Sequence, residues 1–229
     1  RTSKMTSFGY DSTKTGFSLG TTFEQYEDIF ISPDLSTYYE SLSTNDNASI
    51  SLKQQEGTYI DTELRYSIIQ DKRDQSFKPT EGYRASFNQK LPLYSESPSL
   101  INGIDYSAYH SFGDNLIGSL RFHGRAINSL SSSEDVKLSE RLSIPGRYLR
   151  GFEVGKIGPV DASDYIGGNY VTALGFNAAL PKLLPNFTNA DVSLFLDTGN
   201  VWGIDYATNI DESNKLRSAV GVNVDWFTP

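Results

Sequence analysis

Apolar and polar residues alternate along most of this chain, in stretches of about ten positions that are separated by short polar turns. In residues 57–69, the side that carries Ile60 and Leu64 is apolar, and the side that carries Asp61 and Glu63 is charged. A period of two is typical of a β-strand with one apolar face and one polar face. The same pattern predicts strands at 14–26, 30–42, 82–91, 102–112, 115–127, 169–180, 190–202 and 215–227, with a polar loop at 41–49. The chain is therefore predicted to be all-β.

Strand length separates two architectures that share this alternation, a membrane barrel and a soluble sandwich. Strands of about ten residues suit a tilted transmembrane strand, whereas sandwich strands usually have five or six. The polar faces carry bulky charges that suit a watery lumen, and aromatic residues lie near strand ends, as in the girdles of membrane barrels. The pattern favours an antiparallel up-and-down transmembrane β-barrel, here an incomplete excerpt of roughly ten strands. A soluble sandwich and an extracellular barrel remain as alternatives.

The alternation also predicts which side chains face lipid. On the strands with the clearest pattern, they are the apolar residues at every second position. These are Leu64, Tyr66, Phe87, Leu120, Phe122, Val192, Leu194, Leu196, Val220, Val222 and Val224. Membrane lipid is accordingly an expected partner.

One stretch, residues 144–168, has no period and gathers glycines and prolines around a single Arg-Gly-Phe, Arg150 to Phe152. Glycine opens backbone angles that are closed to other residues, and proline fixes φ and removes a donor, so we expect a loop with one compact conformation. Its few charges and its aromatic residues argue against disorder. The residues expected to shape it are Pro145, Gly146, Gly158, Pro159, Gly167 and Gly168. Loops of this length in a compact domain are usually functional when they are ordered.

Composition supports the all-β prediction and argues against several classes of function. The 229 residues include 14 Tyr, 13 Phe and 19 Gly but no Cys, which excludes cysteine chemistry. A net charge of −8 works against a surface for nucleic acid, which is not an expected partner. The mean hydropathy of −0.40 resembles that of a soluble protein, but in barrel strands the lipid-facing and lumen-facing residues cancel in the average.

Patterns associated with catalysis are weak. Residues 16–20 match the G-x-S-x-G of serine hydrolases, but they lie inside an alternating strand with no helix after it, so an ordinary strand is the better interpretation. Neither His110 nor His123 has a second metal ligand at the required spacing. No glycine loop of the phosphate-binding type precedes a helix. We expect no enzyme activity, no metal and no cofactor.

Arg150 is the residue most strongly singled out by the loop. Its planar guanidinium suits a carboxylate on the lumen side of a strand. Parity along residues 190–200 places Ser193, Phe195 and Asp197 on that side, which makes Asp197 the expected partner. The alternative is an arginine in solvent on an exposed loop.

The chain also resembles the barrel domain of the Omp85 superfamily. The motifs that carry the resemblance are Arg147–Phe152 (RYLRGF), Ile157–Pro159 (IGP), Gly167–Asn169 (GGN), Phe195–Trp202 (FLDTGNVW) and Leu216–Gly221 (LRSAVG). Their order and spacing over residues 144–229 make the match specific, and it extends more loosely upstream. There, Asp71, Arg73, Asp74, Pro79 and Gly82 are similar to a hairpin that recurs in the superfamily.

The resemblance implies a role for the loop. In the family, the Arg-Gly-Phe loop folds back into the lumen, here as residues 129–168, and acids on the two following strands anchor it. Arg150, Gly151 and Phe152 would form the loop side of this lock. Asp197 matches one of the acids, whereas Asn177 stands where the other is common. An amide accepts a hydrogen bond but supplies no charge, which leaves the second half of the anchor in question.

The resemblance further implies an integral protein of the bacterial outer membrane. Residues 1–229 would be part of a C-terminal barrel domain, with a signal peptide, periplasmic domains, the first strands and the last strand outside this sequence. The implied function is the folding and insertion of other β-barrels without nucleotide, with nascent outer-membrane proteins and the lipoproteins of an assembly complex as partners. The alternatives are an Omp85-type translocation pore of two-partner secretion or related transport, and a passive porin or surface adhesion barrel.

Overall fold

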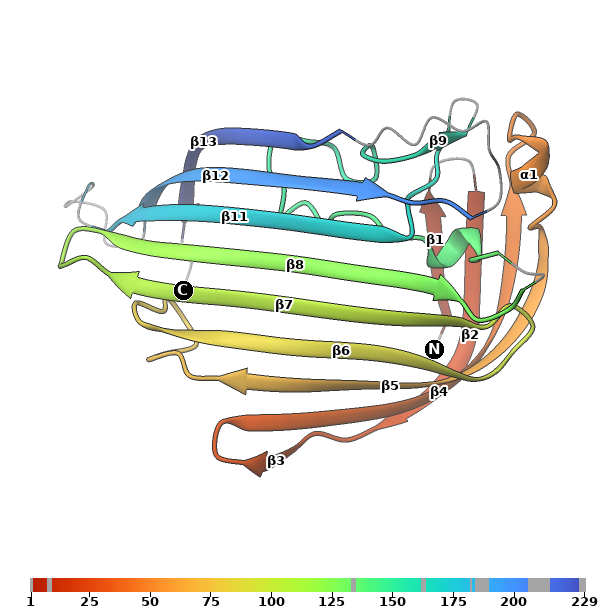
Figure 1. Ribbon diagram of the computed structural model, residues 1–229, viewed down its shortest axis with the longest axis horizontal. Coiled ribbons are helices and arrows are strands. Elements are labelled where there is room, and N and C mark those ends of the chain that lie inside the picture. Colours follow the sequence, from red (N-terminus) through yellow and green to blue (C-terminus); the bar gives the residue numbers. More distant parts are fainter. Residues whose placement is uncertain are drawn as a thin grey trace.

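Eleven antiparallel strands form one continuous sheet in the computed structural model, and each long strand pairs with the next along the chain (Figure 1). The order is β1-β2-β4-β5-β6-β7-β8-β11-β12-β13, with β3 beside β4. The strands are β1 (Thr2–Ser7), β2 (Tyr10–Gly20), β3 (Phe23–Tyr26), β4 (Ile29–Thr44), β5 (Gly57–Asp71), β6 (Gly82–Ser95), β7 (Ser99–Ser111), β8 (Ile117–Ser129), β11 (Tyr170–Leu180), β12 (Ala190–Trp202) and β13 (Arg217–Trp226). The all-β, up-and-down architecture is confirmed. The sheet is open, since its order runs from β1 to β13 without a described pairing between these two strands.

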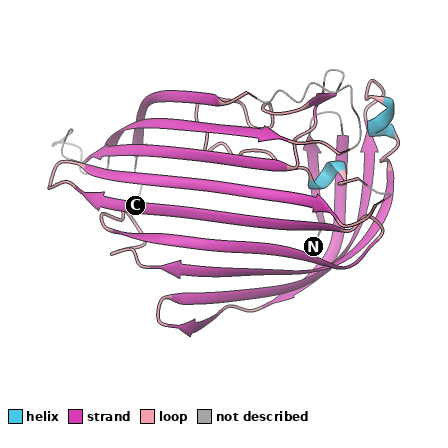
Figure 2. Ribbon diagram, in the orientation of Figure 1, coloured by secondary structure: helices cyan, strands magenta, loops and turns pink. Residues whose placement is uncertain are grey.

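The structure describes residues 2–7, 10–132, 135–161, 164–181, 183, 190–205 and 215–226, and for residues 2–7 it describes the backbone alone. Helical structure in these ranges consists of α1 (Ile50–Lys53) and the short 3-10 turn η1 (Leu138–Glu140), as Figure 2 shows. Neither has the length and apolar character needed to cross a bilayer. Two further strands, β9 (Val160–Asp161) and β10 (Asp164–Tyr165), pair with each other outside the large sheet.

Most predicted strand ends lie within four residues of the observed ones, and two of the differences have a clear structural cause. The strand predicted at 14–26 is divided into β2 and β3, which both pair with β4. The break lies at Thr21 and Thr22, opposite Pro33, and Pro33 has no backbone N–H to continue the ladder. The loop predicted from residue 41 begins only after Thr44, because Leu42 is buried on the inner side of β4 and the ladder with β2 continues.

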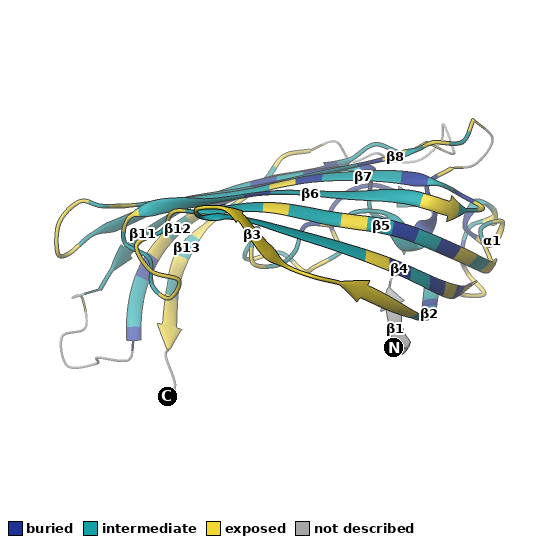
Figure 3. Cartoon of the chain, turned by 90° about the horizontal axis from the view of Figure 1, so that it is seen from below, coloured by how far each residue is buried: buried dark blue, intermediate teal, exposed yellow. Residues whose placement is uncertain are grey.

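One face of the sheet, here called the outer face, carries the predicted lipid-facing residues. Of the eleven, five are exposed and six are half-buried, and none is buried. Leu194 and Val220 are 51% and 82% exposed, so no described segment packs over this face of β12 and β13. Much of β3 and β13 is likewise uncovered (Figure 3).

The opposite, inner face is covered by the segment between β8 and β11, here called the inward loop and described at residues 130–132, 135–161 and 164–169. Its apolar side chains enter two buried clusters. The first joins the inward loop to β2, β4 and α1 through Tyr10, Leu42, Ala48, Leu52, Leu138 and Ile166. The second joins it to β11 and β12 through Ile144, Leu149, Ile157, Val171, Ala173 and Val201. Full burial of each large apolar side chain stabilises the docked loop by about 1.5–3 kcal/mol.

Candidate functional site: the anchors of the inward loop

The structure brings Arg150 of the inward loop against Asp197 of β12. The guanidinium donates from Nε to Oδ2 at 2.7 Å and from Nη2 to Oδ1 at 2.8 Å. The backbone N–H of Arg150 also donates to Oδ2, at 3.1 Å. The Asp197 side chain is fully buried, and that of Arg150 is 21% exposed. A bidentate fork with a third bond from the main chain is a geometry that selects both position and orientation.

Neighbouring side chains complete the surroundings of this pair. The Arg150 guanidinium lies over the Phe195 ring, 3.8 Å from its centroid. Asn177 accepts from Nη1 of Arg150 at 3.5 Å, which is at the limit for a hydrogen bond. Arg121 on β8 approaches Asp197 only to 3.7 Å. Asp197 is thus the carboxylate of this anchor, and Asn177 adds one long contact without charge.

The conformation of the loop around Arg150 depends on glycine. Gly151 has φ +82, in the left-handed region that other residues avoid, and this turn allows Phe152 to pack beside the second cluster. At Gly158, a Cβ would lie 2.8 Å from Cγ1 of Val201, too close for any side chain.

The other predicted loop-shaping residues also lie in close or hydrogen-bonded positions. Tyr148 N donates to the Pro145 carbonyl at 2.9 Å, and Ile166 N donates to that of Pro159 at 3.2 Å. Gly168 exchanges two backbone bonds with Leu142, at 2.8 and 2.9 Å. A Cβ at Gly167 would lie 2.7 Å from the Leu142 carbonyl, and one at Gly146 would lie 3.0 Å from Val154.

A second anchor was not anticipated from the sequence. Lys137 of the inward loop is only 3% exposed and donates to Asp61 of β5, and Glu40 of β4 lies 3.7 Å from its Nζ. Glu140 in the same loop pairs with Lys90 of β6 and accepts from Ser99 of β7. Burial opposes the charge of Lys137, but the carboxylates of Glu140, Asp61 and Glu40 outweigh it and raise the pKa of the amine.

A third anchor holds Tyr148 against β7 and β8. Its hydroxyl donates to Asp105 at 3.0 Å, and its ring stacks on His123 with centroids 4.4 Å apart. His123 and Arg125 bind the same carboxylate. Burial, followed by the charge of Asp105, raises the pKa of the Tyr148 phenol and keeps it a neutral donor. His123, for which the sequence indicated no metal site, is therefore a contact of the loop.

The predicted hairpin motif lies between β5 and β6. Asp71 accepts a fork from Arg73, with distances of 2.8 and 2.7 Å. Asp74 accepts from Thr80 N and Oγ1 at 3.0 and 2.8 Å, which closes the turn that contains Pro79. Gly82 has φ +89, and a Cβ there would lie 2.0 Å from the Lys72 carbonyl. The motif therefore fixes the shape of this turn.

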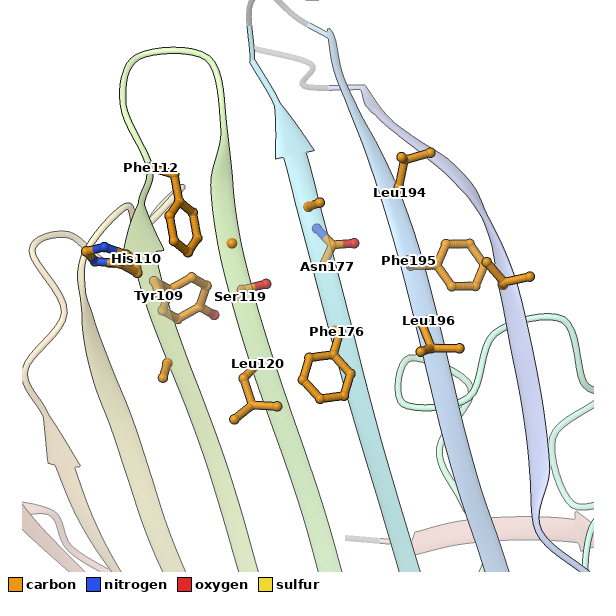
Figure 4. Close-up of a pocket in the computed structure, with 14 residues that line it drawn as sticks. Tyr109, His110, Phe112, Ser119, Leu120, Phe176, Asn177, Leu194, Phe195 and Leu196 are labelled. Carbon is orange, nitrogen blue, oxygen red and sulfur yellow. The ribbon is translucent and has the colours of Figure 1, made fainter.

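An open hollow lies on the outer face. It has a volume of about 570 Å³ and an almost wholly apolar lining. Figure 4 shows Leu120, Phe176 and Leu196 projecting into it from β8, β11 and β12, with Phe112 at one end. Because these strands also carry predicted lipid-facing residues, the hollow is part of the same apolar wall.

The G-x-S-x-G match does not form the strand-to-helix turn that a nucleophilic serine needs. Ser18 of the G-x-S-x-G match lies within β2, opposite Ser36 of β4, in a regular ladder rather than at a strand-to-helix turn. No group of three or more His, Cys, Asp or Glu is arranged to hold a metal within the part of the chain that the structure describes.

Comparisons with known proteins agree with this architecture. The family model described as "Omp85 superfamily domain" matches residues 1–229. The chain is 28% identical over 189 residues to the outer membrane protein assembly factor BamA of Neorickettsia risticii, covering 80% of this chain and 25% of that protein. It is 26% identical over 197 residues to the protein of the same name from Nitratidesulfovibrio vulgaris, covering 83% and 24%. The chain thus spans about a quarter of the length of these relatives.

Two solved structures share the fold. BamA from Haemophilus ducreyi lacking POTRA domains 1–3 superimposes with a TM-score of 0.78 and 20% identity, over 97% of this chain and 49% of that one. CdiB from Acinetobacter baumannii gives a TM-score of 0.56 and 15% identity, over 94% and 36%.

Proposed function

Since the chain belongs to the Omp85 superfamily of outer-membrane β-barrel proteins, we propose that it forms the wall and loop anchor of a protein that assembles other β-barrels into the outer membrane. The observation that supports this most is the buried Arg150–Asp197 pair, in a chain whose curated relatives are named as assembly factors. The proposed activity needs no catalytic group. A client strand is templated by backbone hydrogen bonds at an open strand edge, which is a form of β-augmentation.

In such a mechanism the strands away from the open edge must keep their arrangement, and the three anchors of the inward loop hold them in place. Arg150 ties the inward loop to β12, Tyr148 ties it to β7 and β8, and Lys137 ties it to β4 and β5. One segment therefore braces strands that are far apart in the sheet order. A braced wall keeps its curvature while a seam elsewhere in the barrel opens to a client.

The partners follow from the same proposal. The exposed apolar residues of the outer face contact lipid, and the clients are nascent outer-membrane barrels. The proposal also implies the lipoproteins of an assembly complex as partners.

Reconstitution of the complete protein in lipid vesicles tests the proposal. We expect the vesicles to speed the folding of an added unfolded barrel, measured by its change in gel mobility, without a large steady conductance. A large steady conductance with no effect on client folding would instead favour a translocation pore of the two-partner secretion type.

A further inference from the structure

A polar cavity of about 450 Å³ lies on the inner face, between the inward loop and the strands β6 to β8. Its lining includes four arginines, Arg73, Arg84, Arg121 and Arg147, but only one acid, Asp105. This is a strong local excess of positive charge in a chain of net charge −8. The cavity is separate from the Arg150–Asp197 pair, although Arg121 borders both.

The arginines converge because of strand register. Arg84 of β6 and Arg121 of β8 both lie directly opposite Ser107 of β7. Neighbouring strands are about 4.8 Å apart, so the two arginines flank a gap about twice that wide, which the small serine leaves open. Arg73 closes one side from the turn after β5, and Arg147 contributes from the inward loop.

The nearby carboxylates do not satisfy these guanidiniums. Asp71 is occupied by the fork from Arg73 and lies 3.7 Å from Nε of Arg84. Asp197 is occupied by Arg150 and lies 3.7 Å from Nη2 of Arg121, an atom that is buried without a hydrogen-bond acceptor.

Asp105 and Arg147, the remaining acid and arginine of the lining, do not change this excess of unsatisfied guanidinium donors. Asp105 already accepts from His123, Arg125 and Tyr148. Arg147 lies over the Tyr148 ring, 5.0 Å from its centroid, and forms no ion pair with any residue in the described ranges. Three guanidiniums, those of Arg84, Arg121 and Arg147, thus face one cavity with donors to spare.

We propose that this cavity binds a phosphate group, carried by a small phosphorylated molecule or by a lipid headgroup. Guanidinium forks match phosphate and carboxylate oxygens, but a carboxylate has only two oxygens for three forks. A phosphate monoester has three strong acceptor oxygens and a charge of about −1.5 to −2. The cavity volume lies within the range of small-molecule sites, about 300–1,000 Å³, so it has room for more than the bare anion.

Bound phosphate would join the inward loop to the wall. Arg147 belongs to the loop, whereas Arg84 and Arg121 belong to β6 and β8. A ligand that bridges these arginines binds more tightly when the inward loop is docked than when it is detached. It therefore stabilises the docked state by mass action. The site therefore adds a ligand-dependent anchor to the three built from side chains.

Calorimetric titration of the complete protein in detergent tests the proposal. The probes are inorganic phosphate and short-chain phosphatidic acid, with the matching diacylglycerol as the control without phosphate. We expect saturable 1:1 binding of at least one phosphate probe and none of diacylglycerol. Binding of phosphatidic acid alone would identify the headgroup as the source, and binding of phosphate alone would identify a soluble ligand. Saturable binding of neither phosphate probe would overturn the proposal.

Because Arg147 lies in the inward loop, its substitution tests the site without changing a residue of the strands. Arg147→Gln is expected to weaken binding at least tenfold, and Arg147→Lys to weaken it less, since it keeps the charge but loses the fork. Lys156→Gln makes the same charge change in the same loop, at an exposed lysine paired with Glu153 at 2.9 Å. Equal binding by the Arg147→Gln and Lys156→Gln proteins would contradict the assignment.

Discussion

The single carboxylate of Asp197 receives three hydrogen bonds from Arg150, two from the guanidinium and one from the backbone N–H. It therefore fixes the main chain of the inward loop as well as the side chain. Asp197 is completely buried, so the loss of Arg150 would leave a charge in the wall without its partner. Removing one member of a buried pair destabilises by about 3–5 kcal/mol.

We predict that Arg150→Ala and Asp197→Ala each release the inward loop, seen as faster hydrogen exchange at residues 144–152 of the complete protein. The reversed pair, Arg150→Asp with Asp197→Arg, is expected to restore only part of the protection. Rescue is partial because the backbone N–H at position 150 would then face a guanidinium. Full protection in both single variants would contradict this anchor.

Asn177→Asp is predicted to strengthen the same anchor. Its side chain lies 3.5 Å from Nη1 of Arg150, and Arg121 of β8 lies opposite Gly175, two residues from position 177 along β11. Hydrogen bonds to charged groups contribute about 1.5–3 kcal/mol, so a rise in thermal stability is expected. Asn177→Ala is the control and should change stability by less than about 1 kcal/mol, because the present contact is long. Lower stability of the Asn177→Asp protein would argue against this arrangement.

Gly151→Ala is predicted to destabilise the docked loop by about 1–2 kcal/mol, because φ at this position is +82. The effect is one of backbone strain, since a Cβ there would make only an ordinary 3.6 Å contact with Ala219. Gly146→Ala lies in the same loop without a positive φ, and its Cβ would meet only the movable end of the Val154 side chain, at 3.0 Å, so it should cost less. Thermal unfolding of the two variants makes the comparison, and an equal loss in both would remove the strain argument.

The Lys137 anchor predicts a pH dependence. Burial opposes the charge of Glu140, but Lys90 and Lys137 outweigh it and lower the pKa of this carboxyl below its usual 4.5. Its contribution to stability is complete above pH 4.5 and is lost as the pH falls through the lowered value. The raised pKa of Lys137 acts in the opposite sense: its contribution is complete below the usual 10.5 and is lost as the pH rises through the raised value.

Unfolding midpoints measured across this pH range check the prediction. The Glu140→Gln protein should be less stable than the original on the plateau between these limits and should lose less stability on the acid side. Lys137→Met should lower stability more than Lys156→Met, because only Lys137 is buried among carboxylates. If stability fell equally at acid pH in the proteins with and without Glu140, the titration of this cluster would not be coupled to folding.

The sequence predicted the long strands β5 to β8 and β11 to β13 to within a few residues, because a period of two is a local property, but it did not predict the short β9 and β10. The division of β2 from β3 escaped prediction, since it depends on Pro33 in the partner strand. The alternation of inward and outward side chains along β12 correctly placed Asp197 on the face that Arg150 contacts. The contact of Lys137 with Asp61 joins residues 76 positions apart, and nothing in the aperiodic loop indicated its partner. The four arginines of the polar cavity come from four separate elements, and the net negative charge of the chain gave no indication of a basic site.

The central claim is that Arg150 and Asp197 act as one unit in barrel assembly, and a double-mutant cycle tests it most directly. Client folding by vesicles that contain the complete protein would be timed for Arg150→Ala, Asp197→Ala and the double variant, with Lys156→Ala as control. We predict that each single change slows client folding at least tenfold and that the double variant is no slower than either single one. Unchanged rates in the single variants, or a double variant slowed by the product of the two single effects, would contradict the account.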